Sequence, residues 1–251
     1  MLLDKFLDKL GRLLKMIISN NYIFNHKFQN KNQVTNSNLI LNLLKRKNFN
    51  PTFIVDVGCG HGEWTIKSLN IFPNSKYYLF DANTQNNNKL SLLKKKFKNI
   101  NYEICLLSND ISQYDFFNMG YGSSIYEEQT NNKRYIEKIK SDLLINKLPN
   151  DFFKSKTSLI KLDVQGAEKK VLEGLKESIS LFEVVIMEVS LHNYNKNAPL
   201  FENMIEFMKN NNFRLYDIFD LKRLGNHDSS FLLQFDCVFA RSDSNLLNVK
   251  F

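Results

Sequence analysis

The chain has 251 residues, of which 43% are hydrophobic and 24% are charged, and its formal net charge is +8. This composition excludes a disordered or fibrous protein, and the length allows one large domain or two small ones. No apolar run approaches the ~20 residues that cross a bilayer, and charges interrupt the N-terminal region, so we expect neither a transmembrane segment nor a secretory signal.

Residues 2–18 are predicted to form an amphipathic helix, because apolar side chains recur at helical spacing with charges between them. We expect this helix to pack on the domain or to join two copies in a homodimer; a membrane-surface anchor is the alternative. Residues 20–36 are rich in asparagine and predicted to be irregular. With a further helix over 38–47, residues 1–50 form an N-terminal extension ahead of one domain over 51–251.

Strand and helix patterns alternate through this domain. We predict strands over 53–57, 76–80, 100–107, 159–164, 184–189, 213–219 and 235–240, and helices over 63–71, 89–97, 167–180 and 201–210. Such alternation gives parallel βαβ units, and the last two strands suit an antiparallel pair. The predicted fold class is therefore α/β, a Rossmann-like, mostly parallel seven-stranded sheet with a C-terminal antiparallel strand and helices on both faces.

Residues 109–157 interrupt this alternation. They hold a predicted hairpin over 119–126 and a predicted helix over 131–145. Because the strand and helix rhythm resumes after them, we interpret this segment as an insertion into the domain and not as a second domain.

The most informative segment is the glycine-rich turn after the first predicted strand, DVGCGHG at 56–62. Glycines let the backbone turn tightly and approach a ligand, and ligands of such sheets bind beyond the carboxyl ends of the strands. The dinucleotide fingerprint needs a third glycine where this chain has Glu63, whose charge would oppose a pyrophosphate. S-adenosylmethionine carries a sulfonium and no phosphate, so it is the favoured cofactor. Its expected contacts here are Asp56, Gly58, Cys59, Gly60, Glu63 and Trp64.

Asp81 ends the second predicted strand, where Rossmann-like sites hold an acid that binds the ribose hydroxyls. Ala82 and Asn83 follow it and are expected beside the nucleoside. Leu107 and Ser108, at the end of the third predicted strand, are expected beside the adenine. These residues complete the predicted cofactor site.

Acidic residues also end the fourth and fifth predicted strands. Asp163 and Glu188 hold these places, Glu168 lies at the start of the next helix, and His192 follows the fifth strand closely. Acids at the ends of buried strands are costly unless they are paired or used. We therefore expect a proton-handling cluster above these strands, in which Asp163 also contacts the cofactor.

Four segments occur in the order seen in FkbM-type methyltransferases, which the chain resembles from residue 53 to residue 241. They are DVGCGHG, GSSI at 122–125, IKLDVQGAEKKVLEG at 160–174 and IMEVS at 186–190. This family commonly has alanine and asparagine where the chain has Cys59 and His61, and a Glu-Pro pair where it has Asp81 and Ala82. The resemblance implies the seven-stranded methyltransferase architecture and S-adenosylmethionine-dependent O-methyl transfer, in many members to sugars.

The resemblance also implies an acceptor wall that includes Ser123 and Ser124. We hypothesise that Asp163 or His192 takes the hydroxyl proton while Glu188 orients the sugar, with Glu168 beside them. Arg223 is a further expected substrate contact, to a phosphate of the acceptor. No dedicated metal site is predicted, although Asp163, Glu168 and Glu188 are oxygen ligands that alternatively suit Mg²⁺.

The expected acceptor is a nucleotide-linked or glycan sugar for a bacterial surface polysaccharide such as a capsule. The three cysteines show no metal spacing and indicate a reduced, cytoplasmic setting. The basic residues are scattered and not interleaved with aromatics, so we expect no nucleic acid partner. Methyl transfer to nucleic acid or another small molecule, and a non-catalytic nucleoside-binding module, are the alternatives.

Overall fold

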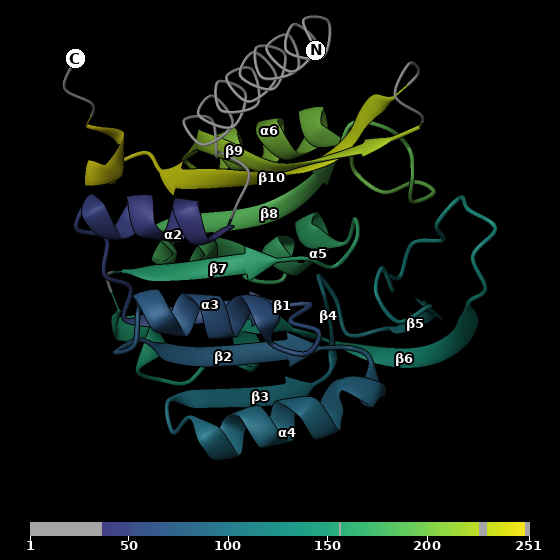
Figure 1. Cartoon of the computed structure of the whole chain (residues 1–251), viewed down its shortest axis with the longest axis horizontal. Coiled ribbons are helices and arrows are strands. Elements are labelled where there is room, and N and C mark those ends of the chain that lie inside the picture. The colour runs from purple at the N-terminus through teal and green to yellow at the C-terminus, as the bar shows by residue number, and fades with distance from the viewer. Residues whose placement is uncertain (1–36, 156, 226–229, 249–251) are drawn as a thin grey trace, which may run out of the picture.

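A seven-stranded sheet forms the centre of the molecule, with strand order β3-β2-β1-β7-β8-β10-β9 (Figure 1). The structure is a computed structural model that describes residues 37–155, 157–225 and 230–248. All neighbouring strands are parallel except at β10, which is antiparallel to both β8 and β9. This confirms the predicted fold class. The strands are β1 (Phe53–Val57), β2 (Lys76–Asp81), β3 (Ile100–Ile104), β7 (Ser158–Leu162), β8 (Val184–Ser190), β9 (Phe213–Leu224) and β10 (Phe231–Arg241).

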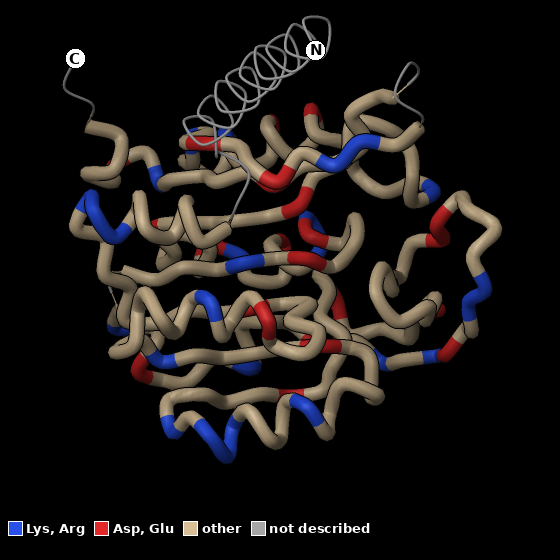
Figure 2. The backbone as a smooth tube through the Cα atoms, viewed as in Figure 1, with Lys and Arg blue, Asp and Glu red and all other residues tan. Residues whose placement is uncertain are grey.

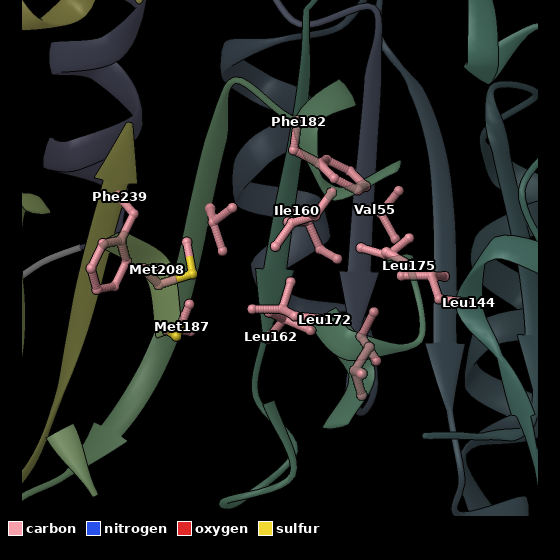
Figure 3. Packing of buried hydrophobic residues seen from close by; sticks show 14 of the residues in the cluster. Val55, Leu144, Ile160, Leu162, Leu172, Leu175, Phe182, Met187, Met208 and Phe239 are labelled. Atoms are coloured by element: carbon pink, nitrogen blue, oxygen red, sulfur yellow. The ribbon is translucent and has the colours of Figure 1, made fainter. Parts of the chain in front are cut away.

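Helices cover both faces of the sheet, as predicted. One face carries α2 (Ser37–Arg46), α3 (Glu63–Ile71) and α4 (Asn87–Lys96), and the other carries α5 (Glu168–Glu173) and α6 (Phe201–Asn210). Each layer buries its own apolar cluster against the sheet. Figure 3 shows part of the cluster on the α5 and α6 side, where Ile160 and Leu162 of β7 lie near Leu172 of α5.

The central strands β1 and β7 are buried along their whole length. They read as apolar runs, as expected for parallel strands covered on both faces. Their only charged side chains are Asp56 and Lys161, which are paired in register near the carboxyl ends of the two strands. Burying either charge alone would be costly, and the two opposite charges offset part of this cost. The polar region of the sheet therefore starts at this register position.

The insertion forms a second, three-stranded sheet of order β4-β6-β5, to the right of the main sheet in Figure 1. Its strands are β4 (Leu106–Ser108), β5 (Gln113–Asn118) and β6 (Tyr135–Leu143). The predicted helix over 131–145 is therefore wrong. Its apolar residues have helical spacing, but Tyr135, Ile136 and Ile139 are aromatic or β-branched, and β5 and β4 offer backbone partners on both edges of β6.

Two further elements are broken where the sequence predicts them to be continuous. The strand predicted over 100–107 breaks at Cys105, where β3 leaves the main sheet and β4 joins the second one. The helix predicted over 167–180 breaks after Glu173, because Gly174 lies against the Ser108 carbonyl and Lys176 has a φ of 52°. A 3-10 helix, η4 (Lys176–Leu181), follows it, and three more lie in loops: η1 (Thr84–Asn86), η2 (Leu144–Asn146) and η3 (Phe152–Lys154).

The last strands are longer than predicted, since β9 and β10 continue past the sheet through register shifts toward residues 225 and 230. A final 3-10 helix, η5 (Asn245–Leu247), follows β10, and its Leu246 belongs to the apolar cluster on the α2 face of the sheet. Over the described ranges, no helix is long and apolar enough to cross a membrane. The helix predicted over 2–18 and the irregular segment over 20–36 lie outside the described residues.

Candidate active site

The glycine turn joins the end of β1 to α3 and is fixed to its neighbours. Gly58 has a φ of 74°, and a Cβ at this position would collide with the backbone carbonyl of Asp163 at the end of β7. Its amide donates to the Phe80 carbonyl at 2.8 Å. Gly60 has a φ of 54°, and no atom lies within 4 Å of the Cβ it lacks. The first glycine therefore permits close packing of β1 on β7, and the second leaves space open.

Asp81 at the end of β2 holds the turn from the other side. Its Oδ2 accepts the amide of Gly60 at 2.7 Å, and its Oδ1 accepts the amide of Asn83 at 2.8 Å and the side chain of Asn86 at 2.9 Å. Burial raises the pKa of Asp81, although these three hydrogen bonds act to lower it. The carboxylate thus stands in a fixed orientation beside the turn.

A cavity of about 760 Å³ lies over the carboxyl ends of the strands, between the glycine turn and the insertion. Such a volume suits a cofactor or small-molecule site. Twelve of the residues predicted to form the site line it: Gly58, Cys59, Gly60, Glu63, Trp64, Asp81, Ala82, Asn83, Leu107, Ser123, Ser124 and Asp163. Six others do not: Asp56, Ser108, Glu168, Glu188, His192 and Arg223.

Asp56 lies under the cavity floor and is fully buried. Its Oδ2 accepts the Thr65 hydroxyl of α3 at 2.6 Å, whereas no described residue bonds its Oδ1. Burial raises the pKa of Asp56 to about 6, against the opposing effects of Lys161 and Thr65. Asp56 therefore does not reach the cavity itself, and its carboxylate interacts electrostatically with Lys161, which does.

A charged cluster occupies the ends of β7 and β8. Lys161, only 7% exposed, bonds Asp163 Oδ2 at 2.8 Å, and Lys222 of β9 bonds Glu188 Oε1 at 2.5 Å. Gln165 bridges the two acids, donating to Asp163 Oδ1 at 2.8 Å and to Glu188 Oε2 at 3.2 Å. Figure 2 shows acidic positions at the ends of β7 and β8 and along β10, with basic positions beside them. Both predicted acids are thus engaged in ion pairs.

These pairs set the charge of each acid. Burial alone would raise the pKa of Asp163, but the nearby Lys161 ammonium holds it below its usual value. Burial and the charge of Asp163 raise the pKa of Glu188. Among residues 37–155, 157–225 and 230–248, no group of three or more His, Cys, Asp or Glu side chains is arranged to hold a metal ion.

Glu168 is buried at the start of α5, and its Oε1 accepts the Val164 amide at 3.0 Å. Burial raises its pKa to about 8, and the charges of Glu188 and Asp163 act in the same direction. The side chain is therefore protonated at neutral pH and fixes the turn between β7 and α5 instead of reaching the cavity.

Replacing Glu168 by glutamine is expected to stabilise the protein increasingly as the pH rises. Folded Glu168 holds its proton up to about pH 8, whereas unfolded glutamate loses it near its ordinary pKa of 4.5. Between these values the folded state binds more protons than the unfolded state, so wild-type stability falls as pH rises and E168Q avoids this loss. Melting temperatures from about pH 5 to 9 measure it, with the exposed E177Q as control. Parallel curves for wild type and E168Q would contradict this account.

The insertion contributes one wall of the cavity through residues 120–125. Ser124 donates to the Gln165 carbonyl at 2.9 Å, so this wall is attached to the turn after β7. Tyr121 is exposed and its hydroxyl lies 3.2 Å from His61 Nδ1 of the glycine turn. Ser123 donates to the Gly120 carbonyl at 2.8 Å and shapes the tip of the loop. The cavity is therefore bounded by the glycine turn and by the insertion.

Three remaining predicted residues lie outside the lining. The His192 ring is exposed and packs edge-on against Phe231, with centroids 4.9 Å apart. Arg223 is exposed on β9. Ser108 is buried, and its hydroxyl donates to Tyr114 at 3.0 Å.

Sequence reasoning missed several residues that line the cavity. Lys161 and Gln165 lie inside the quoted segment IKLDVQGAE, where a lysine within a buried strand was an available signal. Asp236 is a lone acid in the apolar run FLLQFDCVFA, and Lys222 lies in a stretch predicted to be a loop. For Asp236 the sequence carried no sign of which end of the sheet it reaches, whereas Lys222 is the neighbour of Arg223, which we expected to contact the acceptor.

The donors of the glycine turn decide which cofactor suits it. The amides of Gly58 and Cys59 donate to Phe80, that of Gly60 donates to Asp81, and that of Gly62 donates to Cys59. These amides are occupied, and Glu63 places a carboxylate in the first turn of α3, where a pyrophosphate would bind. The acids around it suit a cation instead. The residues present fit S-adenosylmethionine and do not fit a dinucleotide.

A mostly parallel sheet with one antiparallel strand near its end, and an acid-rimmed cavity beyond its glycine turn, defines a Rossmann-like methyltransferase. The chain belongs to the methyltransferase FkbM domain family, whose model matches residues 30–215. This match begins within the N-terminal 50 residues, which we expected to lie outside the resemblance, and it ends before β10. No curated protein sequence matches the chain.

Several solved structures are similar to the chain in fold. An S-adenosylmethionine-dependent methyltransferase from Clostridium acetobutylicum is 9% identical, with 88% of this chain and 98% of that chain covered and a TM-score of 0.46. A precorrin-6y C5,15-methyltransferase from Geobacter metallireducens is 12% identical, with 81% and 87% covered and a TM-score of 0.44. An rRNA methylase from Streptococcus thermophilus is 13% identical, with 81% and 94% covered and a TM-score of 0.43.

Proposed function

We propose that the chain transfers the methyl group of S-adenosylmethionine to a hydroxyl of a sugar, either nucleotide-linked or within a glycan, in the synthesis of a bacterial surface polysaccharide. One observation carries this proposal. A single cavity joins the Asp81 and glycine-turn side to the Asp163 and Lys161 side, so one ligand on each side would meet in the same space.

The charge of the cavity as a whole suits the proposed donor. Asp81 is placed to accept the ribose hydroxyls, as its strand-end position predicts. Of the charged residues in the lining, five are acids (Glu63, Asp81, Asp163, Asp220 and Asp236) and three are lysines (Lys67, Lys161 and Lys222). This excess of acids favours a cationic ligand. When bound, S-adenosylmethionine supplies a methyl group already activated by the sulfonium charge.

The acceptor side offers hydrogen-bonding groups of both kinds. Gln165, Lys222 and Asp220 line it, and the Ser123 and Ser124 loop forms the adjoining wall. Alternating donors and acceptors of this sort suit a ligand rich in hydroxyls. Orienting such a ligand against the methyl donor accounts for several kcal/mol of rate acceleration in enzymes of this kind. The family and the basic net charge support a sugar carried on a nucleotide or a glycan.

Asparagine in place of Asp81 is expected to weaken S-adenosylmethionine binding about 10–100-fold, which corresponds to the ~1.5–3 kcal/mol of a hydrogen bond to a charged group. The amide would also point an N–H at the Gly60 amide, which now donates to Oδ2. Calorimetric titration of both proteins with S-adenosylmethionine measures the change. Asp151, an exposed acid paired with Lys76, provides the matched control D151N, which should bind normally. Unchanged affinity in D81N would remove Asp81 from the cofactor site.

The function itself is tested by incubating the protein with S-adenosylmethionine and a panel of nucleotide sugars, oligosaccharides and RNA, with mass spectrometry of every product. A mass increase of one methyl group on a sugar, at oxygen, is expected. Methylation of RNA, or at carbon or nitrogen, would contradict the proposed acceptor. Binding of S-adenosylmethionine with no transfer to any acceptor would favour a non-catalytic module.

A further inference from the structure

Asp236 lies on β10 at the level where the other acids of the site end their strands. It is the register partner of Glu188, and Glu188 is bridged to Asp163 by Gln165. Side chains directly opposite on antiparallel strands lie about 5 Å apart on the same face of the sheet. Three neighbouring strands, β7, β8 and β10, therefore present one carboxylate each in a single row. Asp236 is the last of the row and lines the cavity.

The basic side chains of the row are already committed to two of its acids. Lys161 bonds Asp163, Lys222 bonds Glu188, and Gln165 bonds both. Within the described part of the chain, no hydrogen bond or ion pair reaches the Asp236 carboxylate. Of the three acids in the row, Asp236 alone has its oxygens available to a ligand in the cavity.

The surroundings of Asp236 set its affinity for a proton. Burial raises its pKa to about 7; Lys161 of β7 and Lys222 of β9 act to lower it, and Glu188 of β8 and Asp163 of β7 act to raise it. A base is most effective when its pKa lies near the working pH, since it is then both available as carboxylate and able to hold the proton.

We propose that Asp236 is the catalytic base that accepts the proton of the acceptor hydroxyl. This inference rests on the proposed function. In the transfer, the acceptor oxygen forms its bond to the methyl carbon as the carbon–sulfur bond breaks, and the electron pair of that bond stays on sulfur. The hydroxyl proton passes to the Asp236 carboxylate and from there to solvent. S-adenosylhomocysteine and the methyl ether are the products.

Asp163 and His192, which the sequence suggested for this role, and the neighbouring Glu188 are less well placed. Asp163 carries ion-pair and hydrogen-bond partners on both oxygens, and its pKa is held below its usual value by Lys161 despite its burial. Glu188 is likewise engaged at both oxygens. The His192 ring packs on Phe231 and does not line the cavity. Asp163 and Lys161 are better described as positioning residues that hold the row in place.

The test compares wild type with D236N, which keeps the shape of the side chain, and with D151N, an acid outside the cavity, as control. D236N should lower kcat about 10²–10⁴-fold, the usual contribution of a general base. Its affinity for S-adenosylmethionine, measured by calorimetry, should stay within about threefold of wild type, and D151N should match wild type in both. Wild-type kcat should rise with pH through about 7 and then level off, and D236E should recover part of the rate.

A second measurement does not depend on turnover. Carbon-13 NMR of carboxyl-labelled protein should show one aspartate that titrates near pH 7 and that disappears in D236N. An Asp236 titrating near 4, or D236N turning over within about threefold of wild type, would overturn the assignment. Absence of methyl transfer by wild type counts against the proposed function, whereas a wild-type spectrum without a near-neutral aspartate, or one that keeps it in D236N, counts against Asp236 alone. Melting curves exclude unfolding of D236N as the cause.

Discussion

Alanine at position 58 is expected to destabilise the protein by about 2–6 kcal/mol and to abolish S-adenosylmethionine binding. Two costs add at this residue. Its φ of 74° is unfavourable for any residue with a Cβ, at ~1–3 kcal/mol, and the new methyl group collides with the backbone of Asp163, where overpacking costs ~1–3 kcal/mol. Because β1 and β7 carry the two halves of the site, separating them moves the glycine turn away from the charged row.

The collision can be separated from the backbone strain by a matched variant. Gly120 has a φ of 80° in the insertion loop, and no atom lies within 4 Å of its missing Cβ. G120A therefore carries only the conformational cost of ~1–2 kcal/mol. Urea unfolding of both variants, with calorimetric titration of cofactor, measures the difference. Equal destabilisation of G58A and G120A would show that the contact with Asp163 is unimportant.

Methionine in place of Lys161 is expected to cost about 1–3 kcal/mol of stability at pH 8, less than for a fully buried ion pair because the Asp163 side chain is 36% exposed. Methionine is similar in length and shape, so the loss reflects charge. Asp163 would lose the ammonium that bonds it at 2.8 Å, and Asp56 would lose its register neighbour. Asp56 would stay fully buried with only the Thr65 hydroxyl as partner, whereas the Asp163 side chain, which is 36% exposed, would keep its hydrogen bond from Gln165.

The loss of stability in K161M should depend on pH. Lys161 acts to lower the pKa of Asp56, which is about 6, and of Asp236, which is about 7, so both rise further in the variant. As the pH falls toward 5, the folded variant takes up protons at these acids and its deficit should shrink. Denaturant unfolding at pH 8 and 5 measures this. K138M removes an exposed pair with Asp115 and should change stability by less than ~1 kcal/mol. A deficit independent of pH would contradict the electrostatic explanation.

The sequence predicted those parts of the fold and site that depend on local signals. Gly58 and Gly60 follow a buried strand, and Asp81 ends the next one. Glycines at a strand end indicate a tight turn and an acid at a strand end indicates a ligand contact, so these residues could be placed on one wall of the cavity. Asp163 was placed correctly at the end of its strand for the same reason. The α/β class followed from the alternation of strand and helix patterns along the chain. This alternation recurs several times, so the predicted class stays correct even when a single element is predicted wrongly.

The rest depended on pairing between distant segments. Residues 135–143 have helical spacing and became a strand because β4 and β5 flank them, which no local pattern records. Asp236 and Lys222 reach the site only because β10 runs against its neighbours and β9 pairs with it. Their contribution could not be inferred without the register. His192 was placed near the site by its distance from β8, but a side chain after a strand can turn to either side, and here it packs on Phe231.

Because β10 is antiparallel to β8 and β9, residues of the last two strands line the cavity together with residues from earlier in the chain. The glycine turn, Asp81 and Asp163 lie within residues 30–215, which match the family model, whereas Lys222 and Asp236 come from the hairpin beyond it. The family model therefore covers the glycine turn and part of the acceptor wall, and leaves Lys222 and Asp236 outside. We expect exchange of residues 216–241 between family members to carry acceptor preference with it, and to leave cofactor affinity where it was.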